Sequence, residues 1–564
     1  MKTALNTVRE TDVDGVLCFY VDTGRPASAA HLLFRQGVAD EPLAQTGWLH
    51  LLEHLALLDV ETLSRPIHGR VSMLLTRFAA FGSPEEVSRH IGALCRWVAE
   101  PDLRLLARER GVLQARAQQR HDPLVRSLTW RYGATGPGVA SYAEVGAVRA
   151  TAEMLAEHSW RVFNAANAIL VLDGPPPAEL RLPLPAGEYL PPAPATPVQR
   201  RLPAAYRDDA GLTLSGVVSR THEATFLPTI LERAVHDGLR DRTGGAYGPW
   251  SSMTEVDDQH LVVAGGADVV PEVMSVVCSA GVEVVRQLAE DGVPRVWVEE
   301  AVQQRLSRLD SAGALADVAL ESAYAVLSDR VPMSHEELLG ELRGTDPRQV
   351  DAAARELAAT LLVGLPEGAT LDRGLRLVSF RETEPTGQGP RHSHVNWPAD
   401  LATFSADGTV AEEVRGTTAR ALRIDEVVGL FAWRDGSRRL VGRDGSVLEM
   451  DASQWVRADR LAEAIDAAVP ADLHLAMPDR EVTFRRMSTA ERAAIGFARA
   501  ANTRHGLIVL VSVMAMLTLW SVVGGHRLMA FVLLVLSACL GAQLWRVEDG
   551  RLGTHPAPAS ADPA

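Results

Sequence analysis

Two patterns of apolar and polar positions alternate through the first part of the chain. Short apolar or alternating runs of period two predict strands at 15–23, 29–34, 70–78 and 168–172. Between them, apolar residues recur three or four positions apart, which predicts helices near 84–98, 102–120, 124–132 and 147–163. Ser83-Pro84 opens the first of these helices with an N-cap residue and a proline at the first helical position. The first part of the chain therefore mixes strands and helices.

A proline-rich stretch separates this part from a second one with the same order of elements. Ten prolines lie between Pro175 and Pro203, which favours an extended linker. After it, strands are predicted at 212–219, 247–255, 260–267 and 359–363, and helices at 227–240, 271–291, 295–327 and 347–357. The repeated order indicates a duplicated α+β unit, with halves at 1–174 and 206–370 joined by the linker 175–205.

The last third of the chain changes character twice. Within 396–470, three Asp-Gly pairs separate short apolar or alternating runs, which is typical of hairpins and predicts a small antiparallel β domain that ends in a helix. A capped helix is expected at 488–504. Two uncharged apolar runs at 506–523 and 528–545 follow, and we interpret 506–545 as a transmembrane helical hairpin.

Charge and cysteine usage add a location to this picture. Arginines flank the two ends of the predicted hairpin, and the loop between its runs offers Arg527, so the positive-inside rule predicts a membrane protein whose body faces the cytoplasm. The four cysteines are scattered and form no disulfide framework, which suits a reducing compartment. The formal net charge of −15 argues against a nucleic-acid partner, because no positive surplus exists to release counterions.

The candidate chemistry lies in the sequence Gly47-Trp48-Leu49-His50-Leu51-Leu52-Glu53-His54. On a helix, His50 and His54 leave the same face one turn apart, and Glu53 shares that face. Two imidazoles with a carboxylate beside them commonly hold a catalytic zinc ion, and the order H-x-x-E-H is one form of that motif. The alternative is an ordinary helix with two half-buried histidines and a solvated acid.

The motif and its surroundings resemble the insulinase/pitrilysin family of zinc metallopeptidases. The segment Arg35-Gln36-Gly37-Val38-Ala39-Asp40-Glu41 is similar to one that precedes the motif in that family, and Glu109-Arg110-Gly111-Val112-Leu113 is similar to the Glu-Arg-x-Val helix of the family. In the second half, Arg240 and Tyr247 stand seven apart, as in the family's Leu-Arg…Gly-Tyr segment. The resemblance covers about residues 10–365.

The resemblance implies a zinc ion held by His50 and His54, with Glu53 as the base that deprotonates the attacking water. Glu109 would stand behind the ligands, and Arg240 and Tyr247 would donate hydrogen bonds toward the peptide carbonyl or the oxyanion. It also implies a dimer, either of this chain with itself or with a related subunit, because the zinc half and the Arg–Tyr half can meet across a subunit boundary.

One position departs from the family pattern. The third zinc ligand would be a glutamate seven residues after Glu109, and this chain has Arg116 there. Arginine cannot lose its proton to become a ligand, and its charge opposes a dication. Three interpretations remain: Glu109 or Glu144 supplies the third ligand, zinc is lost and Arg116 pairs with Glu53 or Glu109, or another subunit carries a complete site.

The expected fold class is therefore α+β, with two related metallopeptidase-type α/β sandwich halves, a small antiparallel β domain and a C-terminal transmembrane helical hairpin. The expected function is that of a membrane-anchored zinc metalloendopeptidase-like protein acting on peptides or proteins. The alternative is a catalytically degenerate subunit of the same fold, which binds peptides or acts as a scaffold at the membrane. An added peptide strand would pair at the strand 70–78.

Overall fold

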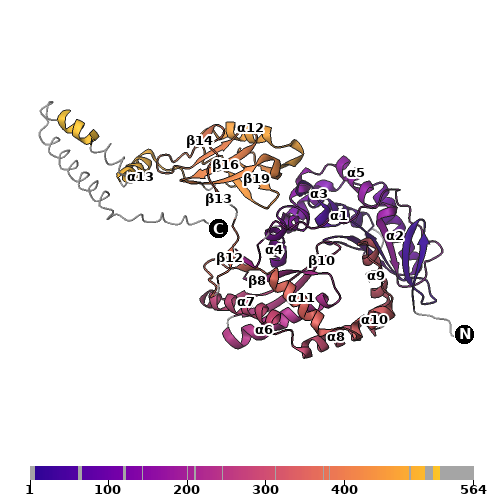
Figure 1. The fold of residues 1–564 in the computed structure, drawn as a ribbon. Coiled ribbons are helices and arrows are strands. Elements are labelled where there is room, and N and C mark those ends of the chain that lie inside the picture. Colours follow the sequence, from indigo (N-terminus) through magenta and orange to yellow (C-terminus); the bar gives the residue numbers. More distant parts are fainter. Residues whose placement is uncertain are drawn as a thin grey trace.

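Each half of the chain builds its own sheet, and a smaller β domain follows (Figure 1). The computed structural model describes residues 7–60, 67–117, 122–142, 144–199, 201–208, 211–243, 246–311, 313–372, 374–379, 382–481, 484–501 and 512–520.

The sheet of the first half has six strands in the order β1-β2-β6-β3-β5-β4. They are β1 (Val8–Val13), β2 (Val16–Val21), β3 (Ala29–Phe34), β4 (His68–Val71), β5 (Thr76–Phe81) and β6 (Ala168–Leu172). All five residues of β6 are buried, because side chains pack on both faces of the sheet at that strand. At the other end, β4 is an edge strand, and β5 is its one partner among the described strands.

The first half also contains five helices within the described residues, and three of them pack on one face of its sheet. The five are α1 (Trp48–Val60), α2 (Pro84–Ala99), α3 (Leu106–Ala117), α4 (Pro123–Tyr132) and α5 (Ala152–Val162), with short 3-10 turns η1 (Val38–Asp40), η2 (Leu43–Gln45), η3 (Gly136–Tyr142), η4 (Val145–Arg149) and η5 (Ala165–Asn167) between them. The predicted capping of α2 is present, since Ser83 Oγ accepts a hydrogen bond from the backbone N–H of Glu86. Apolar side chains of α1, α2 and α5 form one core with the sheet.

The second half repeats this plan. Its sheet runs β12-β7-β11-β8-β10-β9, with β7 (Ala204–Arg207), β8 (Leu212–Ser219), β9 (Ala246–Glu255), β10 (His260–Val269), β11 (Leu362–Leu365) and β12 (Arg376–Leu377). Its helices are α6 (Leu227–Thr243), α7 (Met274–Glu290), α8 (Arg295–Leu309), α9 (Ala314–Leu327), α10 (His335–Arg343) and α11 (Pro347–Ala359), with turns η6 (Glu223–Phe226) and η7 (Pro271–Val273). The strand β9 is an edge of this sheet, as β4 is of the first.

Each half lends one helix to the sheet of the other half. Ala319, Ala323 and Leu327 of α9 pack in a shared cluster with Leu33 and Ile169 of the first sheet (Figure 1). In return, Leu124, Leu128 and Tyr132 of α4 pack on Val262 and Ala264 of β10. The exchange covers the second face of each sheet and thereby joins the halves through apolar contacts.

A buried arginine strengthens this junction. Arg131 of α4 is 2% exposed, and its guanidinium donates hydrogen bonds to the carbonyl oxygens of Thr360, at 2.9 Å, and Ser215 in the second half. Burial lowers the pKa of Arg131 to about 10. The two acceptors compensate part of the cost of burying this cation.

The smaller domain contains two sheets. The first runs β13-β17-β16-β15-β14 and the second β20-β19-β18-β21, where β18 and β21 pair in parallel. Bounds are β13 (Glu382–Thr383), β14 (Arg391–Ser393), β15 (Thr403–Ala406), β16 (Val410–Arg415), β17 (Thr418–Arg423), β18 (Val427–Ala432), β19 (Arg438–Gly442), β20 (Val447–Met450) and β21 (His474–Ala476), with helix α12 (Ala458–Ala468) and turns η8 (Ile424–Glu426) and η9 (Ala471–Leu473). Phe431 and Leu475 of this domain share a cluster with Leu43 of η2, so the domain packs against the first half.

Two predicted elements are divided in the structure. The expected strand at 70–78 is the junction of β4 and β5, which a turn at 72–75 folds into a hairpin, and the edge is β4 alone. The expected helix at 295–327 is two helices, α8 and α9, with Asp310 as the C-cap of α8. The division turns α9 away from α8 and toward the first sheet.

The prediction of a C-terminal transmembrane hairpin is wrong for this structure. None of the helices in the described part of the chain combines the length and apolar character that a membrane crossing requires. Of this region the structure describes helix α13 (Thr489–Ala501) and a helical piece at 512–520. The rest of the predicted hairpin lies outside the described residues. The membrane anchor and the cytoplasm-facing location were inferred from that hairpin and are withdrawn with it.

Candidate functional site

Glu41 fixes the start of the helix that carries the candidate site. The first backbone N–H groups of a helix have no partner within it. The two carboxylate oxygens of Glu41 accept hydrogen bonds from the backbone nitrogens of Gly47, at 2.9 Å, and Leu49, at 2.7 Å, at the start of α1. These hydrogen bonds favour the ionised form of Glu41 and lower its pKa, but burial is the larger effect and raises the pKa to about 8. The segment that precedes the motif therefore positions α1.

His50, Glu53 and His54 converge at one point, as their spacing on a helix requires. One ligand atom from each residue lies within 4.8 Å of the other two. Oε2 of Glu53 is 3.9 Å from Nε2 of His50 and 3.9 Å from Nε2 of His54. Glu53 is buried, and burial raises the pKa of its carboxyl group.

Two carboxylates from distant segments orient the histidines. Oε1 of Glu144 lies 2.7 Å from Nδ1 of His50, and Oε2 of Glu109 lies 3.2 Å from Nδ1 of His54. Because a carboxylate accepts, each Nδ1 carries the proton and each Nε2 faces Glu53. Gly47 allows Glu144 to approach, since a Cβ on this residue (φ +88°) would lie 2.9 Å from Cα of Glu144.

Arg116 occupies the place where the resemblance implies a third zinc ligand. It lies in the last turn of α3, two turns after Glu109, and its Nη1 is 3.3 Å from Nε2 of His54. The guanidinium donates and the imidazole nitrogen accepts, so the lone pair that would bind a metal is already used. Burial lowers the pKa of His54, and the Arg116 charge acts in the same direction. His54 is therefore held as a neutral imidazole between an acid and a cation.

The residues present do not fit a catalytic zinc ion. Two histidines remain as donors, but Nε2 of His54 accepts from Arg116 and a fixed positive charge stands at the third position. Glu109 and Glu144 are engaged by the Nδ1 atoms and act behind the ligands, so neither replaces the missing one in this arrangement. If Glu53 were the third ligand, the site would lose its base.

The edge strand β4 passes directly over Glu53. A Cβ added to Gly69 would lie 2.1 Å from Oε1 of Glu53, so the close approach of strand and carboxylate requires a glycine. Beyond β4 the sheet ends, and the outer edge of this strand carries backbone groups without a partner strand among the described residues. The site thus consists of a buried acid beneath an open strand edge.

The resemblance implies two further site residues. Arg240 lies in the last turn of α6 and Tyr247 near the start of β9, both in the second half. A role for either side chain stays a prediction. In turn, the contribution of Gly69 was not foreseen, and Glu144 was expected only as a possible ligand. The contact of Glu144 with His50 joins residues 94 positions apart, which no local pattern reports.

Known proteins resemble this chain in structure but not in sequence. The sequence matches no family model and no curated protein. Among solved structures, the chain is similar to the inactive domain of an M16 peptidase from Pseudomonas fluorescens, with 14% identity over 65% of this chain and 100% of that one and a TM-score of 0.53. It is also similar to a chain of complex III2 from Candida albicans, with 12% identity over 64% of this chain and 96% of that one and a TM-score of 0.51.

These likenesses establish the fold. The chain has the fold of the M16 peptidases, the insulinase/pitrilysin type, which confirms the fold expected from the motifs around His50 and His54.

Proposed function

We propose that this chain is a non-catalytic protein of the M16 fold that binds an extended segment of another polypeptide. The observation that carries the proposal is the contact between Nη1 of Arg116 and Nε2 of His54, at 3.3 Å. A guanidinium at this distance takes the place of the metal as the positive partner of the histidine. The catalytically degenerate alternative is thus favoured over the zinc endopeptidase.

The histidines of the motif find hydrogen-bonding partners within the chain, without a dication. Glu109 pairs with His54 and Glu144 with His50, while the guanidinium of Arg116 acts on both Glu53 and His54. A zinc ion placed among these groups would be repelled by Arg116 and would have to displace its hydrogen bond. The arrangement therefore supports a structural role for these residues and not a role in zinc-dependent hydrolysis.

Binding of an extended segment is supported by the strand edge beside this network. The outer edge of β4 offers backbone hydrogen bonds to an added strand, and Gly69 presents no side chain toward Glu53. The similar domain from Pseudomonas fluorescens is itself described as inactive, so the fold also occurs without activity. The partner that supplies this segment would be a second subunit, either another copy of this chain or a related one.

Metal analysis of the full chain tests the loss of zinc. After incubation with zinc sulfate and gel filtration, the native chain is expected to retain far less than one zinc ion per chain. Arg116→Glu removes the cation and restores a carboxylate, so its zinc content should rise toward one per chain and fall again when His50→Ala is added. Arg89→Glu, which changes an exposed arginine on α2 in the same way, is the matched control and should behave as the native chain.

Peptide hydrolysis is measured on the same samples. A quenched fluorescent peptide should be cleaved no faster by the native chain than by Glu53→Gln. A full zinc complement in the native chain that disappears in His50→Ala, together with cleavage that is lost in Glu53→Gln, would overturn the proposal in favour of a zinc endopeptidase.

A further inference from the structure

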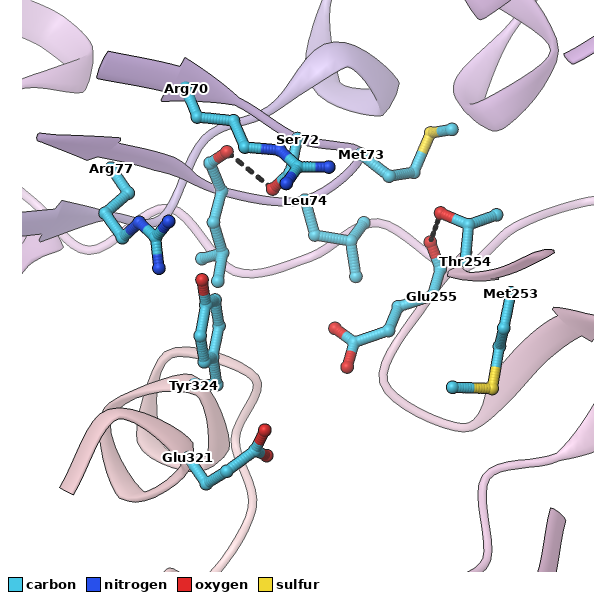
Figure 2. A pocket seen from close by; sticks show the side chains of 11 residues that line it. Arg70, Ser72, Met73, Leu74, Arg77, Met253, Thr254, Glu255, Glu321 and Tyr324 are labelled. Atoms are coloured by element: carbon cyan, nitrogen blue, oxygen red, sulfur yellow. Dashed lines mark hydrogen bonds between the residues drawn. The ribbon is translucent and has the colours of Figure 1, made fainter. Parts of the chain in front are cut away.

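A pocket of about 290 Å³ lies where the two halves meet, next to the end of β4 (Figure 2). Arg70 and Arg77 of the β4–β5 hairpin form one wall, and Met73 and Leu74 of its turn line the pocket beside them. The opposite wall comes from the second half: Glu255 at the end of β9, and Glu321 and Tyr324 on α9. In Figure 2 Tyr324 points its hydroxyl from α9 toward the hairpin that carries both arginines.

The two arginines belong to a row of side chains that crosses the sheet. Leu33 of β3 is paired with Arg77 of β5, and Arg77 is paired with Arg70 of β4. Residues paired directly across strands project from the same face, and Leu33 packs with α9 on that face. The row ends at Arg70, because β4 is the edge. A strand added to β4 would extend it, and its residue opposite Arg70 would project into the pocket.

Charge decides which side chain suits this position. Arg70 and Arg77 are like charges directly opposite each other, which is unfavourable without a counterion. Neither forms an ion pair with any carboxylate in the described part of the chain. Across the pocket, the carboxylate of Glu255 is already paired with Arg220. Arg305, Arg330 and Arg220 all act electrostatically on Glu321. The lining thus carries two arginines and two glutamates, but the glutamates already interact with arginines of the second half, whereas Arg70 and Arg77 face each other.

We propose that this pocket binds a carboxylate of the added strand, at the position opposite Arg70. The inference rests on the proposed function, because it requires a segment paired with β4. Arg70 and Arg77 supply the guanidinium donors, and the Tyr324 hydroxyl supplies a further one from the second half. An acidic residue at this position would neutralise the two facing arginines and link the halves through one bound side chain.

The register also fixes where the acidic residue stands in the bound segment. Successive residues of a strand project to opposite faces. Gly69 faces Glu53 on the α1 side, whereas Arg70 faces the pocket on the α9 side. The residue opposite Gly69 therefore points toward the His–Glu network, and its neighbour opposite Arg70 is the acidic one. The pocket that would recognise the acidic residue therefore lies on one face of the sheet, and the H-x-x-E-H motif lies on the other.

Fluorescence anisotropy with the full chain tests this inference. The probes are short dye-labelled peptides of alternating threonine and valine with blocked ends and a single central Glu, Gln or Lys. We expect the Glu peptide to bind about tenfold more tightly than the Gln peptide, as charge-assisted hydrogen bonds suggest, and the Lys peptide to bind more weakly than both. The preference for Glu should shrink as salt concentration rises. A Gln peptide with a free C-terminal carboxylate tests whether a chain end serves as well as a side chain.

Variants assign the preference to the pocket. In the double variant Arg70→Gln, Arg77→Gln, the preference for the Glu peptide over the Gln peptide should disappear. Tyr324→Phe should reduce the preference only in part. Arg89→Gln is the control on a distant surface and should keep the full preference.

The outcomes separate this inference from the proposed function. If Gln and Glu peptides bind equally to the native chain, the carboxylate pocket is refuted while strand binding stands. Tighter binding of the Lys peptide would assign the pocket to Glu255 and Glu321 and overturn the inference. If none of the peptides binds at millimolar concentration, strand addition at β4 fails, and the inference fails with it.

Discussion

His54 is held between two partners of opposite charge: its Nδ1 lies 3.2 Å from Oε2 of Glu109, and its Nε2 lies 3.3 Å from Nη1 of Arg116. The acid can only accept and the guanidinium can only donate, so both contacts select the same neutral tautomer, protonated at Nδ1. A histidine locked from both sides in this way has no lone pair left for a metal.

Because the two contacts are redundant, we predict that either can be removed without changing the tautomer. Nitrogen NMR of the imidazole should show protonation at Nδ1 in the native chain and in the single variants Glu109→Leu and Arg116→Leu. The double variant should lose this preference for Nδ1, because the remaining acidic neighbour of His54 is then Glu53, whose Oε2 lies 3.9 Å from Nε2. Protonation at Nε2 in the native chain would contradict the geometry. Glu157→Leu, at an exposed position of α5, is the control.

Local spacing predicted one part of this site and missed another. The convergence of His50, Glu53 and His54 follows from helix geometry alone, so the sequence was sufficient. The contact of Glu144 with His50 depends on how distant segments pack, and no spacing reports it. The departure at Arg116 could be noticed only through the resemblance, and its contact with His54 required the folded chain.

The errors in the fold have similar causes. The stretch 70–78 alternates like a single strand, but it contains a tight turn without glycine or proline to mark it. In this turn the backbone N–H and the hydroxyl of Ser72 both donate to the carbonyl oxygen of Leu75. The membrane spans predicted at the C-terminus rest on hydropathy alone, and none of the described helices is long and apolar enough to cross a membrane.

The loop before the motif depends on Gly37 for a packing reason. A Cβ at Gly37 would lie 2.5 Å from the backbone oxygens of Ser72 and Met73, which belong to the hairpin turn beside the pocket. Since backbone atoms cannot rotate away, Gly37→Ala should lower the free energy of unfolding by about 1–3 kcal/mol and move the turn. Chemical denaturation measures the first effect, and hydrogen exchange at Ser72 and Leu75 measures the second.

Gly111 offers the matched control. It lies within α3, and a Cβ there would meet no atom within 4 Å. Gly111→Ala should therefore raise the free energy of unfolding by about 0.5–1 kcal/mol, because alanine restricts the unfolded chain and favours the helix. Equal effects of the two substitutions would show that the close approach at Gly37 does not matter.

Acid sensitivity should come in part from His158, which is buried against Trp48 in the core of the first half. Burial, assisted by the neighbouring charge of Arg161, lowers the pKa of His158 from 6.5 to about 3. Between these values the unfolded chain binds a proton at this residue and the folded chain does not. Stability from this group is therefore complete above pH 6.5 and falls as the pH drops toward 3, by about 1.4 kcal/mol per pH unit.

His158→Gln cannot bind the proton, so its urea midpoint should fall less steeply between pH 6.5 and 4.5 than that of the native chain. Parallel profiles for His158→Gln and the native chain would show that His158 is protonated in the folded state.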